Sequence, residues 1–199
     1  MDLSKVPIPK SGKKLDNIWA DKISKYWVEQ NNSSIKRFIA GGEWGQAYEI
    51  EDNKVLKVTV GIEEAAYAYE AMKDKPFGYV PIHEVLRVNE SVFIIIMDLI
   101  EQPEYLMNIT KELDDILDSK SLSINSDPKS VEDLIQNDFM IEILFDLHDI
   151  VVSNDKFPMG DVHCENIGFK LGTTELVVID QMFDFVDEKY YQKEIEQME

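Results

Sequence analysis

The chain has 199 residues, of which 44% are hydrophobic, and its formal net charge is −19 at pH 7. A chain of this length and composition can bury a core, which excludes a compositionally disordered polymer. The acidic surplus argues against general binding to nucleic acids or to anionic membranes, because both depend on lysine and arginine contacts with phosphate groups. It is compatible with a basic protein partner, with an acidic mimic of DNA, and with good solubility alone.

The compartment follows from what the sequence lacks. Its single cysteine, Cys164, excludes an intramolecular disulfide and disfavours a zinc cluster. The N-terminus shows no cationic segment followed by an apolar run and a cleavage site, and no stretch reaches the length of a membrane span. We therefore expect a soluble protein of a reducing cytoplasm. No pattern predicts an oligomeric state.

Residues 1–34 carry six lysines and four acidic residues, the only positive balance in the chain. Within this segment four apolar residues recur at helical spacing: Trp19, Ile23, Tyr26 and Trp27. The spacing predicts a short amphipathic helix that packs on the body of the protein. A basic, aromatic arm that binds a partner is the alternative.

Residues 35–100 are rich in predicted strands. Alternation and turn residues predict strands at 38–39, 47–50, 55–60, 85–88 and 92–97. Residues 62–72 contain no helix breaker and predict a helix between the third and fourth strands. The segment therefore has the order of three strands, a helix and a hairpin.

Residues 101–155 hold fourteen acidic residues against three lysines, a balance of −11. Helices are predicted at 104–117 and 131–152, separated by a serine-rich loop. In the second helix one face is predicted to hold Leu134, Phe139, Ile143, Leu144 and Leu147. Short strands are predicted at 167–170 and 176–179, so the expected fold class is α+β.

Two glycines, Gly42 and Gly45, lie between the first two predicted strands. Glycine lets backbone amides approach phosphate groups without an intervening side chain. A glycine hairpin without any function is the alternative. On the third strand Lys57 lies on the face opposite Leu56 and Val58, where a lysine on a solvated sheet face is the alternative to a functional one.

The polar motif near the C-terminus is Asp161, then Asn166 five residues later, then Asp180 at the end of a short apolar strand. An ionised carboxylate at such a strand end is costly unless it binds a metal or accepts hydrogen bonds. A turn cap is the alternative for Asp180. His163 is a candidate brace for the loop or a phosphate contact, and a packed neutral histidine is its alternative.

In this order these residues resemble the protein-kinase-like superfamily, over roughly residues 38–180. The run from Gly160 to Asn166 is similar to the catalytic loop of the atypical branch, which includes the aminoglycoside and choline phosphotransferases. The whole chain is similar to the small serine/threonine kinases of lytic bacteriophages. That similarity rests on four stretches: 45–48, 55–58, 65–67 and 161–167.

The resemblance implies a compact kinase-like fold in three parts. These are an N-terminal extension over 1–34, a strand-rich small lobe over 35–100, and a reduced, mostly helical large lobe over 101–199.

The resemblance also implies a role for each site residue. Asp161 would be the catalytic base, Asn166 and Asp180 would bind Mg²⁺, and Gly42 and Gly45 would cover the phosphates of ATP. Lys57 would hold the α- and β-phosphates, oriented by a glutamate of the following helix. Glu64 is favoured over Glu63, with Glu70 in reserve. Adenine would contact backbone groups of the 97–100 connection, including Asp98 and Ile100.

Three departures from the kinase pattern stand out. Met159 replaces the usual histidine before the catalytic aspartate, Gln181 and Met182 follow Asp180, and only nineteen residues remain after it. They leave no room for an activation segment or for the usual peptide platform. The ATP site is unaffected.

The expected function is an ATP- and Mg²⁺-dependent kinase that phosphorylates serine or threonine hydroxyls of proteins. For a phage-encoded chain these would be host proteins, in the host cytoplasm. One alternative is a small-molecule phosphotransferase, whose cationic acceptor the acidic segment could attract. The other is a pseudokinase or acidic decoy, although joint retention of Lys57, Asp161, Asn166 and Asp180 argues against it.

Overall fold

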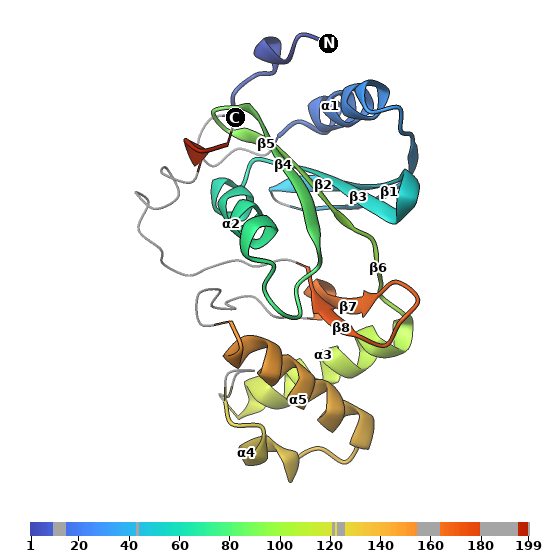
Figure 1. The fold of residues 1–199 in the computed structure, drawn as a ribbon. Helices are drawn as coiled ribbons and strands as arrows, with labels where there is room; N and C mark the ends of the chain where they lie inside the picture. The colour runs from blue at the N-terminus through green and yellow to red at the C-terminus, as the bar shows by residue number, and fades with distance from the viewer. Residues whose placement is uncertain are drawn as a thin grey trace. The chain divides into compact units, whose positions relative to one another are not determined.

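The computed structural model describes residues 1–9, 15–42, 44–120, 122, 126–154, 164–179 and 195–198. The chain forms two compact units. Unit 1 comprises Met1–Lys75, Pro81–Leu99 and Phe185–Glu199, and unit 2 comprises Pro76–Val80 and Ile100–Asp184. Helices and strands are both present, so the predicted α+β class is confirmed (Figure 1). Within the described residues no helix has the length and apolarity that crossing a bilayer requires.

Unit 1 is built on a five-stranded antiparallel sheet with strand order β1-β2-β3-β5-β4. The strands are β1 (Ile35–Gly41), β2 (Gly45–Ile50), β3 (Lys54–Thr59), β4 (Ile82–Asn89) and β5 (Val92–Asp98). Helix α2 (Ile62–Asp74) connects β3 to β4, and short 3-10 turns lie at η1 (Leu3–Lys5) and η2 (Glu51–Asn53). The predicted order of three strands, a helix and a hairpin is confirmed.

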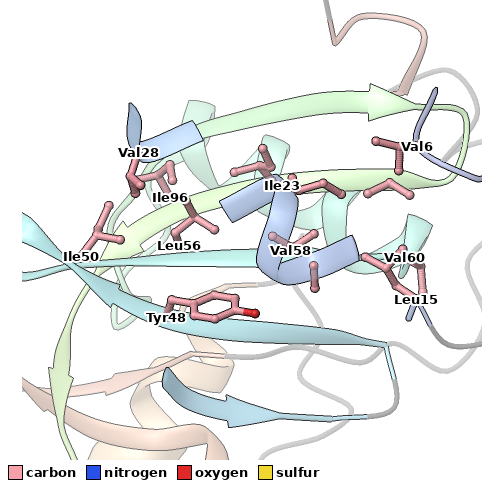
Figure 2. Packing of buried hydrophobic residues seen from close by; sticks show 13 residues of the cluster. Val6, Leu15, Ile23, Val28, Tyr48, Ile50, Leu56, Val58, Val60 and Ile96 are labelled. Carbon is pink, nitrogen blue, oxygen red and sulfur yellow. The ribbon is translucent and has the colours of Figure 1, made fainter. Parts of the chain in front are cut away.

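Helix α1 (Asn17–Gln30) covers one face of this sheet, as the spacing of its apolar residues predicts. Asp16 caps it, because its Oδ1 accepts a hydrogen bond from the Ile18 N–H at 2.9 Å. Ile23 of α1 and Leu56 and Val58 of β3 are fully buried. Figure 2 shows side chains of the helix and of the strands gathered in this core.

Helix α2 packs on the opposite face. Successive side chains of a strand alternate between faces, so Lys57 and Thr59 point away from α1. Alanines on the buried side of α2, Ala65, Ala66, Ala68 and Ala71, let the helix lie close to the sheet. The helix ends at Lys75, which adopts the left-handed conformation (φ 49°).

Unit 2 combines helices with a three-stranded sheet of order β6-β7-β8. Its elements are β6 (Ile100–Glu101), α3 (Glu104–Ser119), α4 (Lys129–Glu132), α5 (Asp138–Val152), η3 (Cys164–Asn166), β7 (Ile167–Lys170) and β8 (Leu176–Val178). The pairing of β7 with β8 confirms the predicted C-terminal hairpin. The predicted division of the chain at residues 34/35 and 100/101 stays a prediction.

The single helix predicted over 131–152 is wrong, because α4 and α5 are separate helices. Asn137 begins α5 as its N-cap, with Oδ1 accepting from the N–H groups of Phe139 and Met140 at 3.0 and 3.3 Å. The apolar face is also shorter than predicted. Leu134 and Phe139 are 41% and 36% exposed, whereas the other three residues are buried: Ile143, Leu144 and Leu147.

The chain between α2 and β4 belongs to unit 2 and fixes the end of β8. The N–H of Val178 donates to Gly78 O at 2.9 Å, and the N–H of Val80 donates to Val178 O at 3.0 Å. Gly78 has φ +73°, and a Cβ there would lie 2.3 Å from Ile150 Cγ1. Glycine is therefore required at this turn both for conformation and for space.

Candidate functional site

Lys57 of β3 and Glu64 of α2 form an ion pair between Nζ and Oε1. Their side chains are only 19% and 16% exposed, so solvent screens the pair less than it screens a surface pair. The structure thus brings Lys57 together with Glu64, which is the favoured glutamate of the three considered. The role of this pair in holding phosphates stays a prediction.

Thr59 joins the pair, and sequence reasoning missed it. Its Oγ1 donates to Glu64 Oε2 at 2.6 Å, so the two carboxylate oxygens contact different residues of β3. The available signal was the position of Thr59 two residues after Lys57, which places both side chains on one strand face. A polar residue next to the lysine on a buried strand requires a partner.

The turn between β1 and β2 is closed by a hydrogen bond from the Gly42 N–H to Gly45 O at 2.9 Å. The two glycines differ in what surrounds them. A Cβ on Gly45 would lie 2.5 Å from Val58 O, whereas a Cβ on Gly42 would meet no described atom within 4 Å. Gly45 is therefore needed for the close approach of β2 to β3, and Gly42 exposes its backbone. Phosphate contact by either glycine stays a prediction.

Two backbone N–H groups of the 97–100 segment, which was predicted to contact adenine, donate hydrogen bonds within the protein. The N–H of Asp98 donates to Pro81 O at 3.0 Å, and the N–H of Leu99 donates to Asn53 O at 2.8 Å. Any adenine contact at these two residues would therefore use their carbonyl oxygens. Ile100 lies in β6, where it pairs with Lys170.

The Asp98 side chain takes part in a charged cluster. Its Oδ1 lies 2.6 Å from Lys54 Nζ and 2.7 Å from His83 Nε2. Burial by itself raises the pKa of Asp98, but the hydrogen bonds from Lys54 and His83 outweigh it and hold the pKa below the ordinary value. The side chain is thus committed within unit 1, so any nucleotide contact of Asp98 is a main-chain contact.

Asn166 ends η3 and directly precedes β7, and the backbone on both sides of it is held. Gln102 Nε2 donates to Glu165 O at 2.8 Å and to Ile167 O at 3.0 Å. The Ile179 N–H donates to Asn166 O at 2.8 Å. The β7–β8 register therefore places Asn166 opposite Ile179, the residue before Asp180.

The remaining predicted site residues, Asp161, His163 and Asp180, lie outside the described residues. Their roles stay predictions. Within the described part of the chain, no three histidine, cysteine, aspartate or glutamate side chains gather as a metal site. An amide oxygen such as that of Asn166 suits Mg²⁺, which takes oxygen ligands and keeps several waters.

The sequence matches no protein-family model and no curated protein. Among solved structures it is similar to the aminoglycoside phosphotransferase APH(4)-Ia, with 17% identity, 47% of this chain and 36% of that chain covered, and a TM-score of 0.33. It is similar to the kinase PK-1 of Cydia pomonella granulovirus, with 15% identity, 80% and 57% covered, and a TM-score of 0.47.

A thermostable mutant of that phosphotransferase, in ternary complex with ADP and hygromycin B, has 16% identity, 46% and 35% covered, and a TM-score of 0.32. The chain thus spans between 35% and 57% of the length of these three proteins.

Proposed function

We propose that the protein is an ATP- and Mg²⁺-dependent kinase that transfers the γ-phosphoryl group to serine or threonine hydroxyls of proteins. The observation that carries the proposal is the Lys57–Glu64 ion pair on the sheet face opposite α1. A lysine that a partly buried carboxylate holds in place presents a fixed ammonium group to the α- and β-phosphates. The turn at Gly42 and Gly45 lies at the start of the strand next to β3 and would cover those phosphates.

In this proposal the residues of unit 2 act on the transferred group. The attacking hydroxyl oxygen forms a bond to the γ-phosphorus, the bond from that phosphorus to the bridging oxygen of ADP breaks, and Asp161 takes the hydroxyl proton. Asn166 and Asp180 would hold Mg²⁺, which supplies positive charge against the phosphate oxygens. The support is the backbone pairing of Asn166 with the residue before Asp180.

The acceptor in this proposal is cationic, because residues 101–155, which include α5, hold fourteen acidic residues against three lysines. Burial, followed by the negative charges of Asp149 and Glu142, raises the pKa of Asp146. A surface of this charge attracts cationic molecules during encounter. The same field favours a basic protein and a small cationic molecule, so a small-molecule phosphotransferase is the second candidate.

The first experiment adds γ-labelled ATP and purified protein to a bacterial lysate. The Asp161→Asn variant tests the base, and Asp21→Asn makes the same chemical change at an exposed ion pair of α1. We expect labelled protein bands with the wild type and with Asp21→Asn, and none with Asp161→Asn. Label confined to small molecules would favour the second candidate. Label in neither fraction would contradict a kinase of either kind.

A second experiment measures thermal stability with Mg-ATP. Nucleotide at about 100 times its dissociation constant should stabilise the wild type by about 2.7 kcal/mol. Asp180→Ala should lose the metal-dependent part of that shift. A wild type whose melting temperature does not respond to Mg-ATP would contradict the nucleotide site.

A further inference from the structure

We propose that Thr59 is a positioning residue that aims the Lys57–Glu64 pair, an inference that rests on the proposed function for its catalytic consequence. Thr59 is the last residue of β3 and is fully buried. Its hydroxyl lies within hydrogen-bonding distance of three groups. These are Glu64 Oε2 at 2.6 Å, the Gly61 N–H at 3.0 Å and Trp44 O at 3.2 Å.

Thr59 can donate only one of these hydrogen bonds. A hydroxyl has one proton and two acceptor lone pairs. The Gly61 N–H donates to Oγ1 and takes one lone pair, so the single proton goes either to Glu64 or to Trp44 O. The contact with Glu64 is shorter by 0.6 Å and its acceptor belongs to an ion-paired carboxylate, which makes it the stronger bond.

The two bonds hold Glu64 at both carboxylate oxygens. Oε1 faces Lys57 and Oε2 accepts from Thr59, and both partners stand on one face of the same strand. Rotation of the carboxylate about its terminal torsion, which is otherwise broad, would break one of the two contacts. Thr59 therefore restricts the direction in which Glu64 holds the Lys57 ammonium group.

The surroundings of the hydroxyl leave little room for another arrangement. A Cβ on Gly61 would lie 3.3 Å from Thr59 Oγ1 and 3.3 Å from Glu64 Cβ. Trp44 O also accepts from the Val60 N–H at 2.8 Å, so the carbonyl keeps a donor while the threonine proton goes to Glu64. The buried Thr59 hydroxyl thus contacts both the turn between β1 and β2, through Trp44 O, and the Lys57–Glu64 pair, through Glu64 Oε2.

The test uses two substitutions that separate the hydroxyl from the shape of the side chain. Thr59→Val keeps the branched shape and removes the donor, whereas Thr59→Ser keeps the donor. Loss of a hydrogen bond to a charged group predicts a fall of about ten- to a hundredfold in kcat/KM for ATP in Thr59→Val. Thr59→Ser should stay within about threefold of the wild type. Equal losses in the two variants would overturn the proposal.

A double-mutant cycle distinguishes positioning from a general effect on packing. In a Glu64→Ala background Thr59→Val should no longer change Mg-ATP affinity, because the group that Thr59 positions is gone. A merely structural role would lower the affinity by the same factor in both backgrounds, and that result would overturn the proposal. Thr59→Cys, a weak donor of similar size, replaces Thr59→Val if the valine variant does not fold.

A readout without catalysis separates this inference from the proposed function. Acetic anhydride at low concentration, followed by peptide mass mapping, gives the acetylation rate of Lys57. A lysine held as an ammonium ion by a carboxylate reacts slowly, so Thr59→Val should raise the Lys57 rate several-fold over Thr59→Ser, with Lys25 as the internal control. Equal Lys57 rates would overturn the positioning role, whereas failure of the wild type to bind Mg-ATP would overturn only the function.

Discussion

The two faces of the five-stranded sheet in unit 1 differ in the kind of side chain that they bury. The face under α1 holds a closed apolar core in which Leu56 and Val58 of β3 meet Ile23 of the helix. The opposite face holds Lys57 and Thr59 of the same strand, joined to Glu64. Because side chains alternate along a strand, β3 contributes Leu56 and Val58 to a core on one side and Lys57 and Thr59 to a charged cluster on the other.

Under the proposed function, one face of β3 therefore contributes mainly to stability and the other to nucleotide binding. Core substitutions on the α1 face should lower the free energy of unfolding and leave nucleotide affinity unchanged. Substitutions on the Lys57 face should change nucleotide chemistry more than they change unfolding.

The largest expected effect is on the polar face. If Lys57 holds the phosphates as proposed, Lys57→Met should lower kcat/KM for ATP by about a hundred- to a thousandfold, because it removes a fixed positive charge from them. Lys54→Met is the matched control, since Lys54 lies on the same strand and on the other face. Steady-state phosphorylation of a labelled lysate protein measures both. Equal losses in the two variants would mean that the faces are not functionally distinct.

The next effect concerns the apolar face. Ile23→Ala should lower the free energy of unfolding by about 2–4 kcal/mol, because it leaves a cavity in a fully buried site. Ile18→Ala, on the same helix but 62% exposed, should change it by less than about 0.5 kcal/mol. Denaturant titration followed by tryptophan fluorescence reports unit 1, because Trp19, Trp27 and Trp44 all belong to it.

The affinity of folded Ile23→Ala for Mg-ATP should match the wild type. A weakened affinity at a temperature where the variant is fully folded would show that the core under α1 also supports the polar face. The separation of the two faces would then fail.

A third prediction compares the two glycines. Gly45→Ala should cost about 1–3 kcal/mol of stability, because its Cβ would lie 2.5 Å from Val58 O and the backbone must shift. Gly42→Ala has open space around its Cβ and should leave the melting temperature unchanged. It should nevertheless weaken Mg-ATP binding several-fold if the Gly42 backbone approaches phosphate. Unchanged binding would favour a hairpin without function.

The smallest expected effect is that of Asp98 at the end of β5. Its folded pKa lies below the ordinary value of 3.8, so its contribution to stability is complete above that pH and is lost as the pH falls through the folded pKa. Asp98→Asn should therefore cost up to about 1 kcal/mol at pH 7, and this difference from the wild type should disappear in acid. A difference independent of pH between 7 and 2 would contradict the assignment to charge.

Much of unit 1 could be predicted from the sequence, because its strands alternate and are bounded by turn residues. The pairing of Lys57 with Glu64 was predicted from the resemblance to kinases, which implies a glutamate of the following helix as the partner of the lysine. Thr59 was missed because its partner depends on where a carboxylate of the next helix points. The backbone N–H groups of Asp98 and Leu99 donate to the carbonyl oxygens of Pro81 and Asn53. Such contacts between distant parts of the chain cannot be predicted from a local sequence pattern.

Unit 2 was predicted less well, for a different physical reason. Apolar periodicity continued through 131–152, so it did not show where the chain leaves the helical path. Helix α5 nevertheless begins at Asn137, because the Asn137 side chain accepts hydrogen bonds from two backbone N–H groups. Strand β6 has only two residues, too few for any alternation. The contacts of Gln102 could not be predicted from a sequence pattern, because its side chain donates to backbone carbonyl groups, which every residue has.

The short sequence distance between Lys57 and Glu64 has a consequence for how the site assembles. Closing so short a loop costs little chain entropy, and the three side chains come from the end of one strand and the first turn of the next helix. The contact order of the cluster is therefore low, and it can form early in folding, before the distant strands β4 and β5 join the sheet. Fraying of the last turns of α2 would leave the cluster intact. Its geometry is local, while its burial depends on the whole unit.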